Sequence, residues 1–152
     1  MTDYVKEFEN VISIVSHDLG KPIDISRICI RDRGVPHQAP RWEDGYMAVY
    51  TFNYKGNFLK IGKAGPKSKA RFVSQHYNSK SAASTLAASI LSDIDMKYQG
   101  ITAENVGDWI KCNCRRIDIL IPADMGIFTL ELIEAALHYK YEPKYEGFDS
   151  QR

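Results

Sequence analysis

Apolar residues recur every three or four positions in several segments of the chain, which is the spacing of an amphipathic helix. The clearest segments are residues 3–16, residues 81–98 and residues 128–141. Residues 68–76 and residues 102–109 are shorter, and each opens on a Ser or Thr that can cap a helix N-terminus. The pattern therefore predicts three longer helices and two short ones.

Other segments alternate apolar and polar residues and are rich in β-branched and aromatic side chains, as strands are. Residues 46–54, 58–62 and 110–121 have this character and predict three strands. In residues 23–30 apolar and polar residues alternate imperfectly. This segment could form either a short strand or a helical turn. Residues 32–44 contain Gly and Pro at intervals and are predicted to be a loop.

The turn signal Lys55-Gly56-Asn57 joins the first two predicted strands into a β-hairpin. If those three residues form the loop, Phe52 lies opposite Lys60 and Tyr50 lies opposite Gly62. Tyr50 and Lys60 then project from the same face of the hairpin. Because Gly62 has no side chain, it would let a backbone or a phosphate approach Tyr50.

A chain of 152 residues is the size of one ordinary domain. The elements predict a mixed α/β fold of the α+β kind, in which helices flank a small central antiparallel sheet of three strands. Residues 45–147 would form this domain. Residues 1–44 would be a helical N-terminal extension packed on it, and residues 148–152 a C-terminal tail.

Composition indicates a globular chain, with 44% hydrophobic and 26% charged residues. No apolar run approaches the roughly 18 residues needed to cross a bilayer, and the N-terminus mixes acidic with apolar residues, unlike a signal peptide. We therefore expect a cytoplasmic protein without a membrane partner. Cys29, Cys112 and Cys114 lack the second pair of ligands that would complete a zinc site, so reduced thiols are expected.

Charge is distributed unevenly, although the net charge is only +1. Residues 45–92 contain no acidic residue. The same interval holds seven cationic residues, namely Lys55, Lys60, Lys63, Lys67, Lys69, Arg71 and Lys80. Such a segment can attract a polyanion even on a nearly neutral protein, although a solvated face is the more common meaning of a charge run.

Glu134 interrupts the apolar stripe of the last predicted helix. It lies beside Ile133, four residues after Leu130 and three before Leu137. A carboxylate on an inward face is costly unless it is paired or binds a metal. Two interpretations stay open, a buried salt bridge, for example to Arg71, and a metal site.

These residues together resemble the GIY-YIG endonuclease superfamily. The similarity rests on Ala48-Val49-Tyr50, Lys60-Ile61-Gly62, Arg71 in the following helix and Glu134 in the last one. It is closest in pattern to the nuclease domain at the start of the excision nuclease of bacterial nucleotide-excision repair, which also matches Gly62-Lys63-Ala64 and the Pro-Lys-Tyr that begins at Pro143. The similarity covers residues 45–147 and leaves residues 1–44 unexplained.

Two positions depart from the family pattern. Lys60 stands where most members have the first tyrosine of the second motif, a replacement that some restriction-enzyme members also use. Glu146 stands where an asparagine usually follows the final Pro-x-Tyr. Lys60 would favour the phenolate of Tyr50 electrostatically. Glu146 either weakens a supporting hydrogen bond or indicates a protein that no longer cuts.

The resemblance implies hydrolysis of a DNA phosphodiester with one divalent cation. Glu134 would hold the metal, and a single carboxylate completed by water and phosphate suits Mg²⁺ or Mn²⁺. Tyr50 would act as the general base toward water. Arg71 and Lys60 would bind the scissile phosphate and offset its developing charge.

Further residues are expected around this centre. His76, one helical turn beyond Arg71, would assist proton transfer or contact a phosphate, against the alternative of a histidine on a helix surface. The remaining contacts to the nucleic-acid backbone are assigned to Lys63, Lys67, Lys69 and Lys80. These contacts position DNA without reading its sequence.

Two other functions stay open. One is a catalytically inactive nucleic-acid-binding module on the same fold, and the other is a protein-interaction domain that retained only the scaffold. The joint presence of Tyr50, Lys60, Arg71 and Glu134 favours the endonuclease over the interaction domain. An enzyme with one such site would need a homodimer, or two visits, to cut both strands of a duplex.

Overall fold

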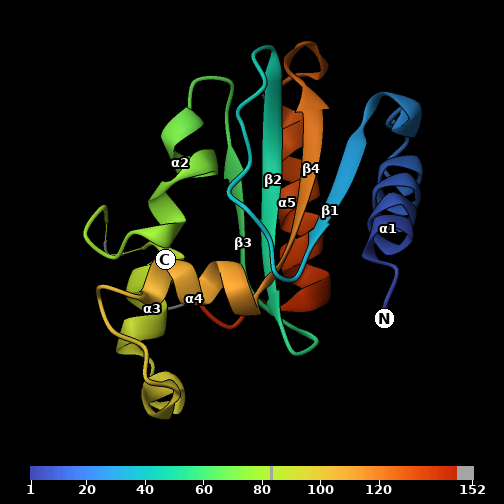
Figure 1. Ribbon diagram of the computed structural model, residues 1–152. Helices are drawn as coiled ribbons and strands as arrows, with labels where there is room; N and C mark the ends of the chain where they lie inside the picture. The colour runs from blue at the N-terminus through green and yellow to red at the C-terminus, as the bar shows by residue number, and fades with distance from the viewer. Residues whose placement is uncertain (83, 147–152) are drawn as a thin grey trace.

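The computed structural model describes residues 1–82 and 84–146 and contains one antiparallel sheet of four strands (Figure 1). The strands are β1 (Cys29–Gly34), β2 (Tyr46–Tyr54), β3 (Asn57–Ala64) and β4 (Arg115–Pro122). They lie in the order β1-β4-β2-β3, so the predicted hairpin and the last predicted strand are neighbours. The mixed α/β class with helices flanking an antiparallel sheet is confirmed.

The expectation of three strands is wrong, because residues 1–44 contribute β1 to the sheet. Ile30 lies opposite Ile119 of β4, and the strand continues to Gly34, inside the segment predicted as loop. The sequence of β1, Cys-Ile-Arg-Asp-Arg-Gly, is mostly polar because the strand lies at the sheet edge and is only partly buried. Its pairing comes from backbone hydrogen bonds, which leave little trace in a hydrophobic pattern.

Helices cover both faces of the sheet (Figure 1). One face packs against α1 (Tyr4–Asp18) and α5 (Ile127–Tyr141), and the other against α2 (Lys69–Val73), α3 (Leu86–Ser92) and α4 (Val106–Asn113). Short 3-10 turns complete the described chain, namely η1 (Ile25–Arg27), η2 (Gln75–Tyr77), η3 (Ile94–Gln99) and η4 (Ala123–Met125). The C-terminal tail assigned to residues 148–152 lies outside the described residues, as does residue 147.

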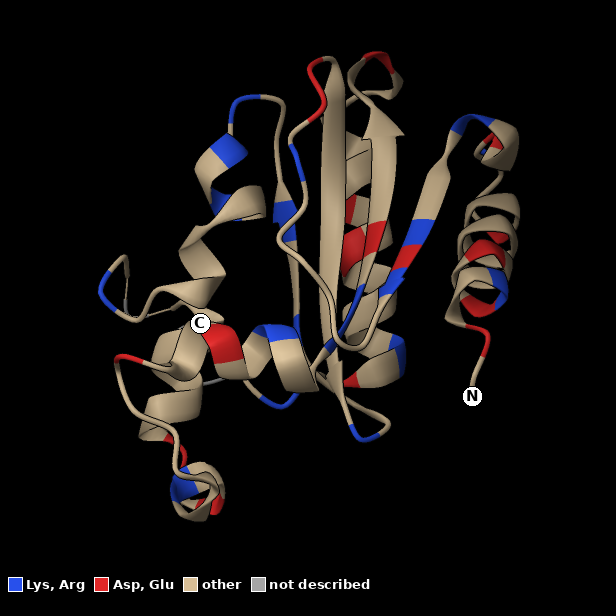
Figure 2. Cartoon of the chain, in the orientation of Figure 1, with Lys and Arg blue, Asp and Glu red and all other residues tan. Residues whose placement is uncertain are grey.

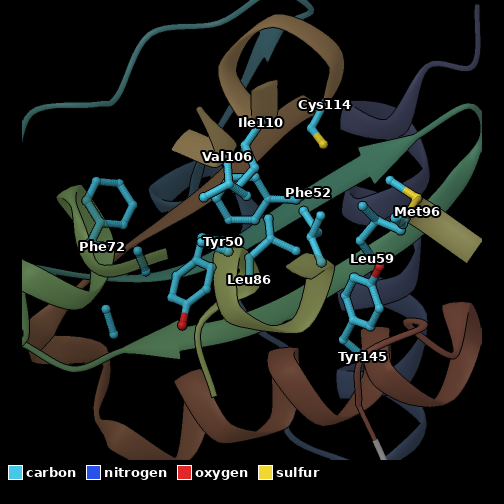
Figure 3. Packing of buried hydrophobic residues seen from close by; sticks show 14 of the residues in the cluster. Tyr50, Phe52, Leu59, Phe72, Leu86, Met96, Val106, Ile110, Cys114 and Tyr145 are labelled. Atoms are coloured by element: carbon cyan, nitrogen blue, oxygen red, sulfur yellow. The ribbon is translucent and has the colours of Figure 1, made fainter. Parts of the chain in front are cut away.

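The two cores follow from the alternation of side chains along the strands. Val49 packs under α1 and α5, whereas Tyr50 and Phe52 pack with α3 and α4 on the opposite face. Figure 3 shows this second core, in which the hydroxyl group of Tyr50 points away from Phe52 and Ile110. Tyr50 therefore has an apolar ring in the core and a polar end at its margin.

The predicted helix over residues 81–98 is wrong as one element. Asp93 has an extended backbone that ends α3, and its carboxylate accepts a hydrogen bond from the backbone N–H of Asp95. Because Asp93 stabilises this break, Ile94 and Tyr98 are not on the buried stripe and are 76% and 91% exposed. Asp, Asn and Ser favour such local bonds over a continuing helix.

Two other boundaries also differ from the prediction. The predicted helix over residues 68–76 is interrupted at Ser74 and becomes α2 followed by η2. Thr102 and Asn105 each accept a hydrogen bond from the other's backbone N–H, so α4 begins at Val106 and runs to Asn113. Residues 110–113 are consequently helical, and β4 begins later than predicted. The helices predicted at residues 3–16 and 128–141 are confirmed.

The register predicted for the hairpin is confirmed, although the turn differs. Tyr50 lies opposite Gly62 and Phe52 opposite Lys60. The loop consists of two residues, Lys55 and Gly56, both with positive φ, rather than three. An irregularity between Phe52 and Asn53 then restores the expected pairing. A bulge and a shorter loop thus give the same register as the longer loop.

The chain after α5 lies along the free edge of β3. The backbone N–H groups of Lys144 and Tyr145 donate hydrogen bonds to the carbonyl oxygens of Phe58 and Leu59 at 2.9 and 3.0 Å. Pro143 cannot continue a helix and directs the chain to this edge. The pairing covers part of an edge strand and brings Glu146 beside β3.

Candidate active site

A pocket of about 420 Å³ lies between β2, β3, the α2–η2 segment and α5. The sequence-predicted residues Tyr50, Lys60, Lys63, Arg71, His76 and Glu134 all line it. Its other lining residues are Ile61, Gly62, Ser84, His138 and Glu146. Predicted residues from distant parts of the chain are therefore gathered in one place, as the motif spacing indicated.

The phenol of Tyr50 lies directly over Gly62. A Cβ added to Gly62 would come within 2.7 Å of Cε2 of Tyr50, and closer still to its hydroxyl group. Real Cβ atoms do not approach other atoms this closely. The tyrosine ring thus fills the space left by the missing side chain of Gly62. Tyr50 also lines the pocket, and the approach of a phosphate to it stays a prediction.

His76 forms a hydrogen bond with Tyr50, and its geometry fixes the direction of that bond. Nε2 of His76 lies 2.6 Å from the hydroxyl oxygen of Tyr50, and Nδ1 lies 3.0 Å from the backbone nitrogen of Leu86. The Leu86 N–H can only donate, so Nδ1 accepts and carries no proton. Neutral His76 therefore bears its proton on Nε2 and donates it to Tyr50.

Burial keeps His76 neutral. Desolvation, followed by the charges of Lys60, Arg116 and Arg71, lowers the pKa of His76 to about 3. His76 is buried, so the alternative of a surface histidine is excluded. It cannot accept the Tyr50 proton, since its only unprotonated nitrogen is already bonded to Leu86. The expected help in proton transfer therefore cannot take the form of accepting the Tyr50 proton, and the expected phosphate contact stays a prediction.

Burial also governs Tyr50. Desolvation raises the pKa of the Tyr50 phenol well above its usual value, and the positive charge of Arg71 offsets only part of this increase. The next favourable charge is Arg116, and not Lys60 as the sequence suggested. Tyr50 is consequently protonated in the free protein and needs further positive charge to ionise.

Lys60 forms an ion pair with Glu146. Nζ of Lys60 and Oε1 of Glu146 are 3.0 Å apart, and the two side chains are only 9% and 16% exposed. The C-terminal segment that pairs with β3 places this carboxylate. Lys60 therefore lines the pocket with its charge already balanced, and is less available to a phosphate than expected.

Glu134 forms an ion pair with Lys63, whose Nζ lies 3.2 Å from Oε1. The side chain of Glu134 is 18% exposed and that of Lys63 is 40% exposed. A salt bridge is one of the two interpretations that the sequence leaves open, but Arg71 is not its partner. Glu134 faces the pocket as its position on the apolar stripe indicated.

The other predicted nucleic-acid contacts lie outside this pocket. Lys67 is on the loop after β3, Lys69 begins α2, and Lys80 follows η2, and all three are exposed. Figure 2 shows basic but no acidic residues along β3, the connection after it and α2. The run of cationic residues thus continues from the pocket strand β3 into α2, which carries both Lys69 and Arg71.

Two residues near the site were not predicted. His138 lies four residues after Glu134 on α5 and lines the pocket, with Nε2 2.5 Å from the carbonyl oxygen of Ile61. That spacing places two residues on one helix face and could have revealed it. Arg116 lies behind the site, where Nη2 donates a hydrogen bond to the carbonyl oxygen of Phe72, next to Arg71.

Arg116 is fully buried, and its guanidinium group has several hydrogen-bond partners. Its guanidinium bonds both carboxylate oxygens of Asp118 and the hydroxyl oxygen of Tyr77, and it lies 4.9 Å from the ring centroids of Phe52 and Phe72. Arg116 and Asp118 alternate within a strand, so the pattern placed both on one face. Both side chains are buried, and Arg116 contacts Phe72 of α2.

The donor set limits the metals that the pocket could hold. Among residues 1–82 and 84–146, no group of three or more His, Cys, Asp or Glu residues could enclose an ion. Glu134 offers a single hard oxygen ligand at a pocket open to solvent and phosphate. This fits Mg²⁺, which keeps several waters and binds through one or two carboxylates together with substrate phosphates.

No family model, curated protein or solved structure matches the chain. The similarity to the GIY-YIG superfamily therefore rests on the motif residues. Within the described part of the chain, no helix is long and apolar enough to span a membrane. Function has to be argued from the chemistry of the pocket.

Proposed function

We propose that the protein is a metal-dependent endonuclease that hydrolyses phosphodiester bonds in DNA. The observation that carries this proposal is the convergence of Tyr50, Arg71, His76 and Glu134 on one pocket. The set combines a proton acceptor, a cation for phosphate and a carboxylate for a hard metal ion. These are the parts that water attack on an anionic ester requires.

Arg71 is the residue best placed to bind the scissile phosphate. It is exposed at the pocket, and no described carboxylate forms an ion pair with it. Its guanidinium can bind two phosphate oxygens at once. Lys67, Lys69 and Lys80 would contact backbone phosphates on either side, which predicts binding that depends strongly on salt and weakly on base sequence.

Glu134 would hold one Mg²⁺ or Mn²⁺ ion. When bound, the ion would polarise the phosphate and stabilise the leaving oxygen. Metal binding at Glu134 requires Lys63 to move away, because its ammonium group forms an ion pair with Oε1 of Glu134 in the free protein. Both residues face the same pocket, so a phosphate bound there could form an ion pair with Lys63 in place of Glu134.

Tyr50 would act as general base after losing its own proton. Its oxygen already accepts the Nε2 proton of His76, so the Tyr50 proton has to pass to water in the pocket and not to the imidazole. The resulting phenolate would keep the hydrogen bond from His76 and be stabilised by the positive charge of Arg71. It would then accept a proton from the attacking water as that water forms the new bond to phosphorus. The bond from phosphorus to the leaving oxygen breaks, and that oxygen takes the electron pair and later a proton from water.

A plasmid-nicking assay with Mg²⁺ or Mn²⁺ tests this function. We expect Glu134→Ala and Tyr50→Phe each to reduce cutting by about 100-fold or more, since each removes a catalytic group. Glu131→Ala and Tyr54→Phe are matched controls on the same helix and strand. Cutting that survives Glu134→Ala would contradict the metal assignment. Accumulation of nicked before linear plasmid would favour two visits over a homodimer.

A second function is favoured by a different observation. Both lysines of the pocket are paired with glutamates, and burial raises the pKa of Tyr50. Because these features leave neither of the two lysines free and give no ready general base at Tyr50, they favour an inactive nucleic-acid-binding module on the same fold. Such a module would bind a duplex in a salt-dependent way, lose affinity on Arg71→Ala and show no cutting with either metal.

A further inference from the structure

The proposed metal ligand is already occupied by a cation of the protein itself. Lys63 reaches from β3 to Glu134 on α5, 71 positions later in the chain, and the two groups are 3.2 Å apart. A divalent ion at Glu134 would lie close to this ammonium group. Like charges at such distances repel, so the ion and the lysine compete for one carboxylate.

The second lysine of the pocket provides a contrast. Lys60 and its partner Glu146 are both largely buried, whereas 40% of the Lys63 side chain is exposed. The ammonium group of Lys63 can therefore leave Glu134 and remain solvated, while that of Lys60 would be left unpaired in a buried position. Lys63 is the lysine that can exchange partners.

We propose that Lys63 couples the binding of metal to the binding of DNA. In the free protein it neutralises Glu134 and weakens metal binding. When a phosphate enters the pocket, Lys63 pairs with it and releases the carboxylate, so DNA raises the affinity for the metal. By linkage, the metal raises the affinity for DNA by the same factor. This inference rests on the proposed function, because it uses Glu134 as the metal ligand.

The coupling can be measured without catalysis. Mn²⁺ alone is titrated into the full chain by calorimetry, comparing wild type with Lys63→Met, Lys63→Gln, Glu134→Gln and the control Lys97→Met, at an exposed lysine of η3. We expect both Lys63 variants to bind Mn²⁺ about fivefold more tightly, because a competing cation has been removed. Lys97→Met should bind as wild type does, and Glu134→Gln should lose this binding.

A second titration measures the effect of DNA. A short duplex is added in the Tyr50→Phe background, where the proposed function predicts no cutting. The duplex should raise Mn²⁺ affinity with Lys63 present and raise it by a smaller factor in Tyr50→Phe/Lys63→Met. Unfolding temperatures close to wild type would show that each variant is folded.

The outcomes separate the inference from the proposed function. If Glu134→Gln weakens Mn²⁺ binding but neither Lys63 variant strengthens it, the competition is wrong and the metal site stands. Equal enhancement by DNA with and without Lys63 would also overturn the coupling. If Glu134→Gln binds Mn²⁺ as wild type does, the metal assignment itself fails.

Discussion

Lys60 and Glu146 form a mutual ion pair, with Nζ and Oε1 3.0 Å apart. They are also the two positions at which the chain departs from the GIY-YIG pattern, where a tyrosine and an asparagine are usual. A buried lysine needs a counter-charge, and a buried glutamate needs one too. The two positions that depart from the pattern are therefore in contact, and each supplies the counter-charge that the other needs.

The first prediction concerns this pair. Glu146→Gln should lower the free energy of unfolding by about 2 kcal/mol, because it leaves Lys60 largely buried without a partner. Lys60→Met should cost a similar amount, and the double variant should cost less than the sum of the two. Urea unfolding of the wild type, the two single variants and the double variant gives the coupling energy between Lys60 and Glu146. Simple additivity would show that the ion pair adds no stability.

The second prediction concerns His76 and acid. Its pKa is lowered to about 3, mainly by burial, and Lys60, Arg71 and Arg116 act in the same direction. The unfolded chain binds a proton near its ordinary pKa of about 6.5, so the contribution of neutral His76 is complete above that pH and is lost as the pH falls toward 3. Tyr50 is the other titratable group in contact with the ring, and it stays protonated over this range.

Unfolding measurements at pH 7 and pH 4.5 test this effect. The loss of stability between these two values should be about 2 kcal/mol smaller in His76→Gln than in wild type. The comparison variant is His17→Gln, at a histidine whose side chain is 78% exposed. An equal loss in wild type and His76→Gln would mean that His76 does not remain neutral.

The third prediction concerns Gly62. Gly62→Ala should displace the Tyr50 phenol, since the new methyl group would lie within 2.7 Å of Cε2. We expect a loss of about 1–3 kcal/mol in stability from overpacking, together with a loss of cutting like that of Tyr50→Phe. Gly65→Ala is the matched control, because its nearest neighbour is the Ser68 Oγ at 4.0 Å. Retained activity in Gly62→Ala would argue against a fixed position for the phenol.

The fourth prediction concerns Arg116. Arg116→Met should lower stability by about 2 kcal/mol or more, because the buried Asp118 would lose this ion-pair partner and keep Arg33. The carbonyl of Phe72 would also lose its donor, which loosens α2 beside Arg71. DNA affinity should therefore fall in the folded variant, as measured by fluorescence anisotropy at a temperature below unfolding. Unchanged affinity would show that Arg116 does not position Arg71.

The sequence predicted the parts of the fold that local spacing determines. The helices α1 and α5 followed from periodicity, and so did the inward position of Glu134. The hairpin register was predicted from a three-residue loop, and it holds because a bulge compensates for the shorter loop. The break at Asp93 has a local part, the bond to the Asp95 N–H, and a distant part, a hydrogen bond that the carboxylate accepts from the Tyr145 hydroxyl group. Such a tertiary contact overrides helical spacing and leaves no local signal.

The sequence indicated which residues line the pocket, but not which of them form ion pairs or hydrogen bonds with one another. Motif spacing brought Tyr50, Arg71, His76 and Glu134 into one pocket. It could not show that Lys63 and not Arg71 reaches Glu134, because side-chain reach depends on the angle between β3 and α5. Nor could it give the protonation of His76, which depends on the Leu86 N–H at the start of α3.

The polar strand β1 has a practical consequence for the N-terminal 44 residues. Arg33 of β1 bonds Asp118 of β4, and β4 is buried along nearly its whole length. A fragment that starts at residue 45 would leave β4 with a row of unpaired backbone groups along a hydrophobic edge. Such edges recruit strands from other molecules. Trimming the protein to a fragment that starts at residue 45 would therefore yield a chain prone to aggregate, rather than a smaller folded domain.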